Sequence, residues 1–308
     1  MTMRESFCTD ADLPLPPMVH AMRCTCRRHA RRRFGQALAV GSLLPLEVLA
    51  AEEGVRAMVG NESTFTKLVP ADQIENAAAQ QYVQLKRDAN AKNALLPEQH
   101  PQVQRLRAIA QRIIPYTSEW NTRARQWKWE VQLLGSKELN AFCMPGGKIA
   151  FYFGILKQLQ LSDDEVAMIM GHEMAHALRE HARERMGKST ATRMGTGLIS
   201  SLLGLGSLGD AALNMGAQLL TLKFSRQDES EADLVGLDLA ARAGYNPQAG
   251  VSLWEKMMKA NANAPMEFFS THPAGNTRIR DIQAVLPKVS PLYERADKPA
   301  QRFEPPRA

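Results

Sequence analysis

The centre of this sequence is a six-residue stretch, Gly171-His172-Glu173-Met174-Ala175-His176, inside residues 162–186, which we predict to be one helix. An α-helix turns about 100° per residue, so His172 and His176 lie one above the other and can bind the same ion. Glu173 lies beside that face. In this His-Glu-x-x-His arrangement two imidazoles bind Zn²⁺ and the neighbouring carboxylate takes a proton from water. The alternative, two surface histidines, is weakened by the adjacent glutamate and the apolar residues before it.

Both ends of this helix can be predicted. The run Ser162-Asp163-Asp164-Glu165 matches a capping box, in which the serine and glutamate side chains bond to free backbone amides. After His176 the sequence becomes charged, so we expect the helix to emerge into solvent and to stop near Gly187. His181 lies about 140° around the helix from His176 and cannot reach the same ion. We interpret His181 as a surface histidine.

A third metal ligand is expected on another element, because a catalytic zinc ion usually has three protein ligands and one open position. Residues 225–244 are predicted to form a helix that begins at Ser225. Glu229 and Asp233 are four residues apart and share a face of it, so one can bind the ion while the other accepts a hydrogen bond from a ligand imidazole. Glu231 points elsewhere. Acidic residues at this spacing are also common on solvent-exposed helix faces.

Two segments before the motif have the alternation of β-strands. Residues 127–134 and 148–153 each place apolar side chains on one face, and Pro145-Gly146-Gly147 predicts a turn into the second segment. Because proline cannot donate to a sheet and glycine permits close backbone approach, residues 148–153 are a candidate sheet edge beside the metal-binding helix. An edge strand can pair with an extended peptide. A simple hairpin without a role in substrate binding is the alternative.

Other segments are predicted mainly by composition. Residues 74–91 and 102–126 have helical composition or spacing, and Pro115 is expected to break the second helix. Residues 195–222 are apolar and contain six glycines. We interpret them as a buried or flap-like segment over the active-site groove, with membrane contact as the alternative.

The first fifty residues indicate an export signal, at about residues 22–50. Five arginines between Arg27 and Arg33 precede an apolar run and small residues, with cleavage expected after Ala50. This predicts a periplasmic, soluble protein; an uncleaved N-terminal anchor is the alternative. Three of the four cysteines lie in or before this leader. Only Cys143 would remain after cleavage, so no intramolecular disulfide is expected.

Outside the first fifty residues, the charges of the chain are close to balance. The chain has 308 residues, 44% of them hydrophobic, and a net charge of +6. Residues 1–50 contain seven Arg and four acidic residues, so 31 basic residues face 28 acidic ones in the remainder. This near balance gives no indication of a nucleic-acid partner.

Four segments together resemble the M48 family of zinc metallopeptidases, over about residues 74–286. They are His-Glu-Met-Ala-His at 172–176, Ser-Arg-x-x-Glu-x-Glu-Ala-Asp at 225–233, Asn-Ala-Phe-x-x-Pro-Gly-Gly at 140–147 and Ser-Thr-His-Pro at 270–273. The resemblance implies an α+β fold: a mostly helical, gluzincin-like zincin domain with a small sheet. The edge strand of this sheet is expected beside the zinc-binding helix.

The resemblance also implies roles for individual residues. His172, His176 and Glu229 would bind one zinc ion, Glu173 would be the general base, and Asp233 would orient a ligand. Substrate polypeptide would bind as an added strand, at Asn140, Gly146, Gly147, Lys148, Ile149 and Ala150. His272 would lie near the metal, where it either blocks the fourth zinc position at rest or donates a hydrogen bond to the oxyanion. These two roles have opposite effects on the rate of cleavage.

We therefore expect a leader (1–50), a linker or arm (51–73), a peptidase domain (74–286) and a Pro- and Arg-rich tail (287–308). Without helical repeats after the domain, the small periplasmic type is the best match. The expected function is zinc-dependent endopeptidase activity on exported, misfolded or unassembled envelope proteins. The alternative is a chaperone-like outer-membrane assembly or quality-control factor that binds extended polypeptide with little cleavage. A peripheral contact with the membrane or with outer-membrane assembly machinery is compatible with both.

Overall fold

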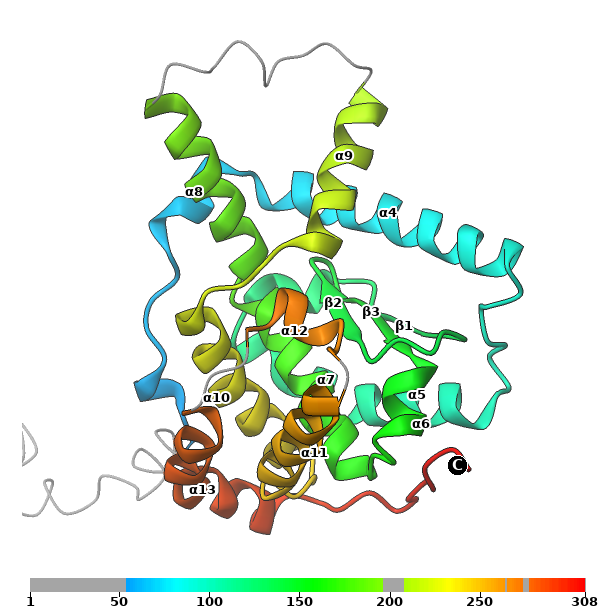
Figure 1. Cartoon of the computed structure of the whole chain (residues 1–308). Coiled ribbons are helices and arrows are strands. Elements are labelled where there is room, and N and C mark those ends of the chain that lie inside the picture. Colours follow the sequence, from blue (N-terminus) through cyan, green and yellow to red (C-terminus); the bar gives the residue numbers. More distant parts are fainter. Residues whose placement is uncertain (1–53, 196–207, 264, 274–276, 308) are drawn as a thin grey trace, which may run out of the picture. The chain divides into compact units, whose positions relative to one another are not determined.

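The computed structural model describes residues 54–195, 208–263, 265–273 and 277–307. In these ranges the chain is mostly helical and contains one three-stranded sheet, which confirms the expected α+β class (Figure 1). The predicted leader lies outside the described residues and stays a prediction. In the ranges given, no helix combines the length and the apolar content that crossing a membrane requires.

The sheet consists of β1 (Glu130–Leu134), β2 (Ala141–Met144) and β3 (Lys148–Tyr152). The strand order is β1-β3-β2, with β3 parallel to β1 and antiparallel to β2. Gly146 and Gly147 connect β2 to β3 with φ angles of 80° and 76°, which side chains rarely tolerate. A Cβ on Gly147 would lie 2.7 Å from the Trp129 ring. The predicted Pro-Gly-Gly turn into a strand is confirmed.

The expectation that residues 148–153 form the sheet edge is wrong. β3 is the central strand and is hydrogen-bonded to β1 on one side and to β2 on the other. Lys148 can be buried there because its ammonium group donates to a Glu130 carboxylate oxygen at 2.8 Å. The local sequence specifies the turn, whereas the pairing of β3 with β1 is a contact between distant segments. The edge strand beside the metal-binding helix is β2.

Helix α7 (Asp163–Leu178) carries the His-Glu-x-x-His stretch and begins at the predicted capping box. The Ser162 hydroxyl accepts a hydrogen bond from the Glu165 N–H at 3.3 Å, and the Glu165 carboxylate accepts one from the Ser162 N–H at 2.8 Å. Almost every side chain of α7 is buried. The motif is therefore carried by the central helix of the core.

Helix α10 (Arg226–Arg242) packs directly against α7 and begins at the predicted Ser225. The two helices meet at Gly171 and Gly236, where a Cβ on Gly171 would lie 2.6 Å from the Gly236 carbonyl oxygen. Glycine at both positions lets the backbones approach closely. This approach brings the acidic residues of α10 up to the imidazoles of α7.

The single helix predicted for residues 162–186 is interrupted. α7 ends before Glu180, whose φ of 55° is left-handed, and α8 (His181–Gly195) begins after it. Periodicity did not show this break because glutamate ordinarily suits a helix interior. The predicted stop at Gly187 is also wrong. Gly187 lies within α8, where a Cβ would be 2.0 Å from the Phe65 carbonyl oxygen, so this glycine permits a close contact.

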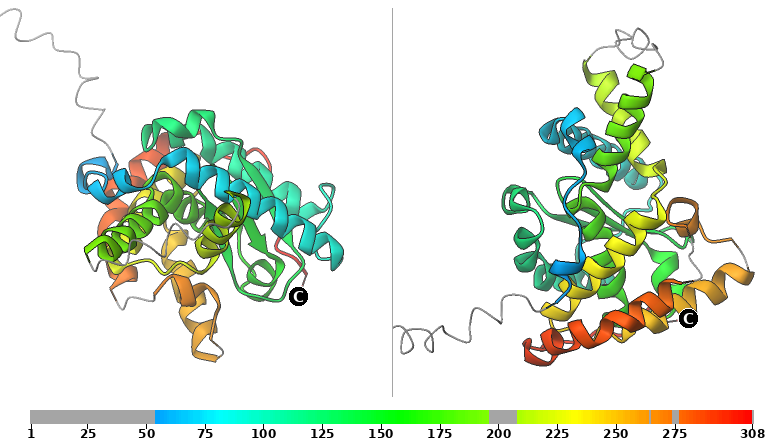
Figure 2. Two further views of the ribbon diagram at one scale, coloured as in Figure 1. Left: turned by 90° about the horizontal axis from the view of Figure 1, so that it is seen from above. Right: turned by 90° about the vertical axis from the view of Figure 1, so that its left-hand side faces the viewer.

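The remaining helices pack against α7, against the sheet or against one another (Figure 2). They are α4 (Ala71–Ala91), α5 (Pro101–Ile113), α6 (Phe153–Gln158), α9 (Leu208–Thr221), α11 (Ala249–Asn263), α12 (Phe268–Thr271) and α13 (Arg278–Arg295), with 3₁₀ turns at Arg56–Met58, Thr64–Leu68, Ile114–Glu119 and Thr122–Gln126. The break expected at Pro115 is confirmed, because α5 ends there and 3₁₀ turns follow.

Most of the described part of the glycine-rich segment forms helix α9, which packs along α4. Residues 196–207 of that segment lie outside the described residues. At the other end of the chain α13 contains Pro287 and Pro291, and the residues after it return to the start of α7. There the Phe303 N–H donates to the Asp163 carboxylate at 2.8 Å.

Candidate metal centre

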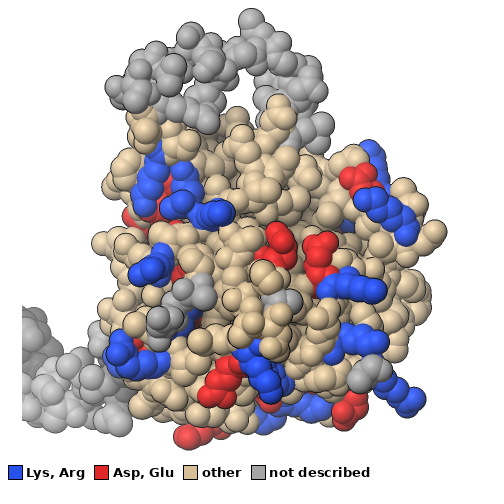
Figure 3. Space-filling view, in the orientation of Figure 1, with Lys and Arg blue, Asp and Glu red and all other residues tan. Residues whose placement is uncertain are grey.

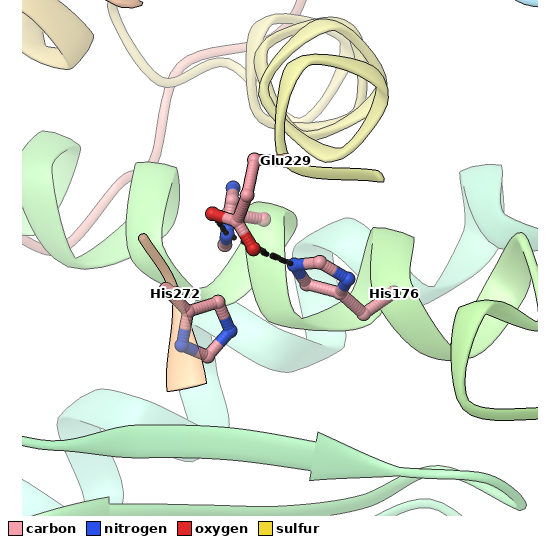
Figure 4. A group of neighbouring side chains, drawn as sticks. His176, Glu229 and His272 are labelled. Carbon is pink, nitrogen blue, oxygen red and sulfur yellow. Dashed lines mark hydrogen bonds and ion pairs between the residues drawn. The ribbon is translucent and has the colours of Figure 1, made fainter. Parts of the chain in front are cut away.

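Four buried side chains from three parts of the chain meet at one point. His172 and His176 come from α7, Glu229 comes from α10, and His272 directly follows α12. One potential ligand atom from each lies within 4.8 Å of all the others. Figure 4 shows the side chains of His176, Glu229 and His272 pointing toward one another. The structure thus brings together the three predicted metal ligands and the predicted neighbour, His272.

The distances within this cluster suit a shared cation. The Nε2 atoms of His172 and His176 are 3.1 Å apart. Glu229 Oε2 lies 3.6 Å from His172 Nε2, and Glu229 Oε1 lies 3.4 Å from His176 Nε2. Two imidazole nitrogens and a carboxylate oxygen are the donor set of many catalytic zinc sites.

Unpartnered polar atoms provide a second test of whether a metal fits. Among the described residues, Glu173 Oε1, Glu229 Oε1 and His272 Nε2 are buried and have no hydrogen-bond partner. A buried polar atom without a partner costs about 1–3 kcal/mol. A divalent cation bound at this point would satisfy the Glu229 oxygen directly. The residues present therefore fit a metal ion.

Asp233 and Arg278 support the His172 side of the centre. Asp233 Oδ1 lies 3.1 Å from His172 Nδ1, as expected for an acid that orients a ligand. Arg278 donates to both Asp233 oxygens, at 2.7 and 2.6 Å, and to Glu229 Oε2 at 2.6 Å. Its guanidinium also lies 3.7 Å from the centre of the Trp254 ring. Arg278 has no predicted role, because a single arginine shortly after His272 carries no pattern of its own.

The charges around His172 fix its tautomer. Burial tends to raise the pKa of Asp233, but the Arg278 guanidinium and the hydrogen bond from His172 hold this pKa well below its ordinary value. Asp233 is therefore ionised and can only accept. His172 must donate from Nδ1, which leaves the Nε2 lone pair free for a cation.

His181 supports the His176 side, and its interpretation as a surface histidine is wrong. It is 2% exposed, its Nδ1 lies 2.9 Å from His176 Nδ1, and burial lowers its pKa to about 4. A neutral His181 can accept a hydrogen bond from His176 Nδ1, so that Nε2 of His176 faces the cluster. The break after Glu180 turns His181 back under the motif, which a continuous helix would not do. His181 is not part of the ligand cluster, as predicted from its spacing.

Glu173 faces a cavity of about 340 Å³ that reaches the cluster. Glu173 Oε1 lies 3.6 Å from His272 Nε2, and both residues line this cavity. Burial, and secondarily the Glu229 carboxylate, raises the pKa of Glu173 well above its ordinary value. A buried carboxylate that holds a proton more readily suits proton transfer.

The residues predicted to bind a substrate strand lie in three different environments. Asn140 lines the cavity, together with all of β2. Gly146 and Gly147 form the turn, while Lys148, Ile149 and Ala150 are buried in the central strand with both edges paired. An added strand cannot pair with β3. The edge that faces the cavity belongs to β2.

The sequence comparisons agree with this geometry. The model of peptidase family M48 matches residues 97–286, which include every residue of the metal cluster. The chain is 32% identical over 215 residues to the mitochondrial metalloendopeptidase OMA1 of Saccharomyces cerevisiae, covering 66% of this chain and 61% of that protein. It is 32% identical over 150 residues to metalloprotease LoiP of Escherichia coli, covering 48% and 59%.

A further relative is the Beta-barrel assembly-enhancing protease of E. coli, 28% identical over 170 residues, which covers 52% of this chain and 35% of that protein. The chain spans about three fifths of the length of the OMA1 relatives from the two yeasts, at 61% and 58%. The match to the family model extends over more than half of the chain and contains the whole metal centre. This protein is a member of peptidase family M48.

Proposed function

We propose that this protein is a zinc-dependent endopeptidase that cleaves extended segments of exported envelope proteins in the periplasm. The observation that carries the proposal is the meeting of two imidazoles and a carboxylate at a cavity that also contains Glu173. The names of the relatives support it, because LoiP is called a metalloprotease and another E. coli relative a β-barrel assembly-enhancing protease. The leader predicted at residues 22–50 supports export.

The chemistry follows from the side chains. His172, His176 and Glu229 would hold zinc, which when bound polarises a carbonyl group and lowers the pKa of water to about 7. Glu173 takes the proton of the attacking water and delivers it to the leaving amine. Asp233 and Arg278 hold His172 and Glu229 in place throughout.

His272 has a hydrogen-bond arrangement that favours one of its two expected roles. Its Nδ1 lies 2.9 Å from the Thr271 hydroxyl and 3.2 Å from the Phe268 carbonyl oxygen, which can only accept. The Thr271 hydroxyl donates to the same carbonyl oxygen at 3.2 Å and so accepts from Nδ1. Nδ1 therefore carries the proton. Burial lowers the pKa of His272 well below its ordinary value, so Nε2 presents a lone pair and no N–H. We infer that His272 is a resting ligand of the metal centre and limits cleavage until it moves.

Substrate polypeptide would pair with the cavity-facing edge of β2. In the described part of the sheet, β2 pairs with β3 alone, so no strand occupies its other edge. A peptide added there would pass Glu173, because the Cys143 backbone of β2 hydrogen-bonds to the Glu173 carboxylate.

The alternative, a chaperone-like factor that binds extended polypeptide with little cleavage, is favoured by one observation, the position of His272. Digestion of an unfolded protein such as casein, with and without a metal chelator, separates the two functions. We expect slow cleavage that stops with the chelator and returns with zinc. Binding of unfolded protein without any metal-dependent cleavage would support the chaperone-like function instead.

A further inference from the structure

The cavity at the metal centre has two chemically different ends. The cavity follows β2. This strand is extended and rises about 3.3 Å per residue, so the two ends of β2 are about 10 Å apart. Glu138, Asn140, Tyr152 and Glu267 line the cavity at the start of β2. Met144 and Pro145 line it at the end of β2. Glu173 and the histidines lie between them.

The acidic end is a defined pair of carboxylates. The Phe268 N–H donates to the Leu139 carbonyl oxygen at 3.2 Å, which brings Glu267 and Glu138 onto adjacent backbone segments. Burial, and secondarily the Glu138 and Glu267 carboxylates, raises the pKa of Tyr152 to about 12. Figure 3 shows acidic side chains gathered beside α12 and β2.

These two carboxylates have no cationic partner among the described residues. Each is exposed, and each is hydrogen-bonded only to a neutral hydroxyl: Glu138 to Ser136 at 3.2 Å and Glu267 to Ser270 at 3.0 Å. Glu130, Glu165 and Glu229, in contrast, form ion pairs with Lys or Arg. Two unpaired carboxylates at the rim of a cavity attract a cation.

The opposite end is apolar. Leu219, Leu220 and Leu222, from the end of α9 and just after it, line the cavity near Met144. Leu219 and Leu222 pack against the cluster of Val69, Ile74 and Ala182, and Leu219 and Leu220 pack against the cluster that contains Met144. This end offers a surface for an aliphatic or aromatic side chain and lacks charged lining residues.

The cavity itself points to a ligand independently of the acidic pair. The Glu173 side chain, which is 2% exposed, lines the cavity, and its Oε1 atom has no hydrogen-bond partner in the described structure. A polypeptide that passes this atom along β2 would extend to both ends.

We propose that the cavity selects polypeptide segments that carry Lys or Arg at the Glu138–Glu267 end and an apolar side chain at the Leu219–Leu222 end. This selectivity rests on the proposed endopeptidase function. Counted along β2, the basic residue lies about three positions from the bond that passes Glu173, because Asn140 is three residues from Cys143. With these two ends the cavity would prefer certain sequences, whereas a metal centre without them would cleave any accessible peptide bond.

The test uses fluorogenic peptides with one apolar residue and with Lys, Gln or Glu placed in turn at each position on either side of the cleaved bond. At one position we expect the ratio of kcat/KM for the Lys peptide to kcat/KM for the Glu peptide to be on the order of ten. This ratio should decrease at high salt. In the Glu138→Gln/Glu267→Gln double variant this ratio should fall toward one. In Glu138→Lys it should fall below one. Glu255→Gln, at an exposed position of α11 away from the cavity, is the matched control and should keep the wild-type ratio.

Binding of the same peptides to the Glu173→Gln variant separates this proposal from the proposed function. Selective binding of the Lys peptide without cleavage by the wild-type protein would support the acidic subsite and contradict the endopeptidase. Cleavage with no charge preference, or a preference unchanged in the double variant, would overturn the subsite and leave the endopeptidase intact.

Discussion

The two imidazoles of the metal centre are held by different partners. His172 Nδ1 meets the ionised carboxylate of Asp233, whereas His176 Nδ1 meets the neutral ring of His181. A carboxylate that accepts from Nδ1 makes the other ring nitrogen a stronger donor to a metal. We therefore expect His172 to be the stronger ligand of the two. Because His181 is neutral, its contribution is to orient the His176 ring rather than to supply charge.

Glu173→Gln is expected to leave zinc bound and to reduce cleavage by about 10²–10⁴-fold. The three ligands remain, while glutamine cannot take a proton from water. Metal analysis of the purified variant, beside a peptide assay, checks both halves of the prediction. Retention of most of the wild-type rate with metal bound would remove Glu173 from the mechanism.

His181→Ala is expected to weaken zinc binding by about tenfold or more, because His176 loses the partner that orients its ring. Competition with a chromophoric chelator measures the affinity directly and does not depend on activity. Glu231→Ala is the matched control, since Glu231 lies 3.9 Å from His181 and outside the ligand cluster. Equal losses in both variants, or an unchanged affinity in His181→Ala, would contradict the orienting role.

His272→Ala is expected to increase the rate of peptide cleavage. The variant removes a lone pair that faces the metal centre, and the general base Glu173 remains. Steady-state assays at fixed zinc concentration show whether the cleavage rate rises or falls. A fall of about 10²-fold would instead indicate that His272 donates to the oxyanion. Phe268→Leu, which keeps the carbonyl that accepts from Nδ1, controls for loss of ring packing.

At the level of the elements, the sequence predicted what local chemistry determines. The starts of α7 and α10 followed from Ser162 and Ser225, and the end of α5 followed from Pro115. The break at Glu180 and the central position of β3 were not predicted, because both depend on contacts with distant segments. For the same reason the buried His181 and the buried Arg278 had no local signal. His172, His176, Glu229 and His272, from three of the motif segments, meet at one point, whereas the part of the expected substrate strand in β3 is buried between two strands.

The close contact between helices α7 and α10 can be tested by adding a side chain at the point where they meet. In Gly236→Ala the new Cβ would lie 2.6 Å from the His172 backbone nitrogen, so the helices must separate. Overpacking of this kind costs about 1–3 kcal/mol. We expect a lower melting temperature and a lower zinc occupancy, measured by thermal denaturation and metal analysis. Gly60→Ala, where a Cβ meets nothing within 4 Å, is the control and should leave both unchanged. A normal zinc content in Gly236→Ala would show that the helix spacing does not set the metal geometry.

Across the whole molecule, the metal centre connects parts of the chain that are distant in sequence. Asp233 and Glu229 are joined through Arg278 of α13, which also contacts Trp254 of α11. The chain after α13 then returns to Asp163 at the start of α7. The centre is thus held by charged and aromatic contacts within the protein as well as by any metal ion. This arrangement determines how the protein should respond to loss of the metal.

Removal of the metal is expected to lower thermal stability without unfolding the protein. Zinc at about one hundred times its Kd adds about 2.7 kcal/mol to the free energy of unfolding, because it binds the folded state alone. Without zinc, Arg278 still pairs with Glu229 and Asp233, and α7 remains buried in the core. Circular dichroism during heating, with chelator and then with added zinc, should show one helical transition that moves to higher temperature with zinc. Glu229→Ala should show little shift. Loss of the helical signal at room temperature after chelation would mean that the metal holds α7 and α10 together, and that Arg278 does not suffice.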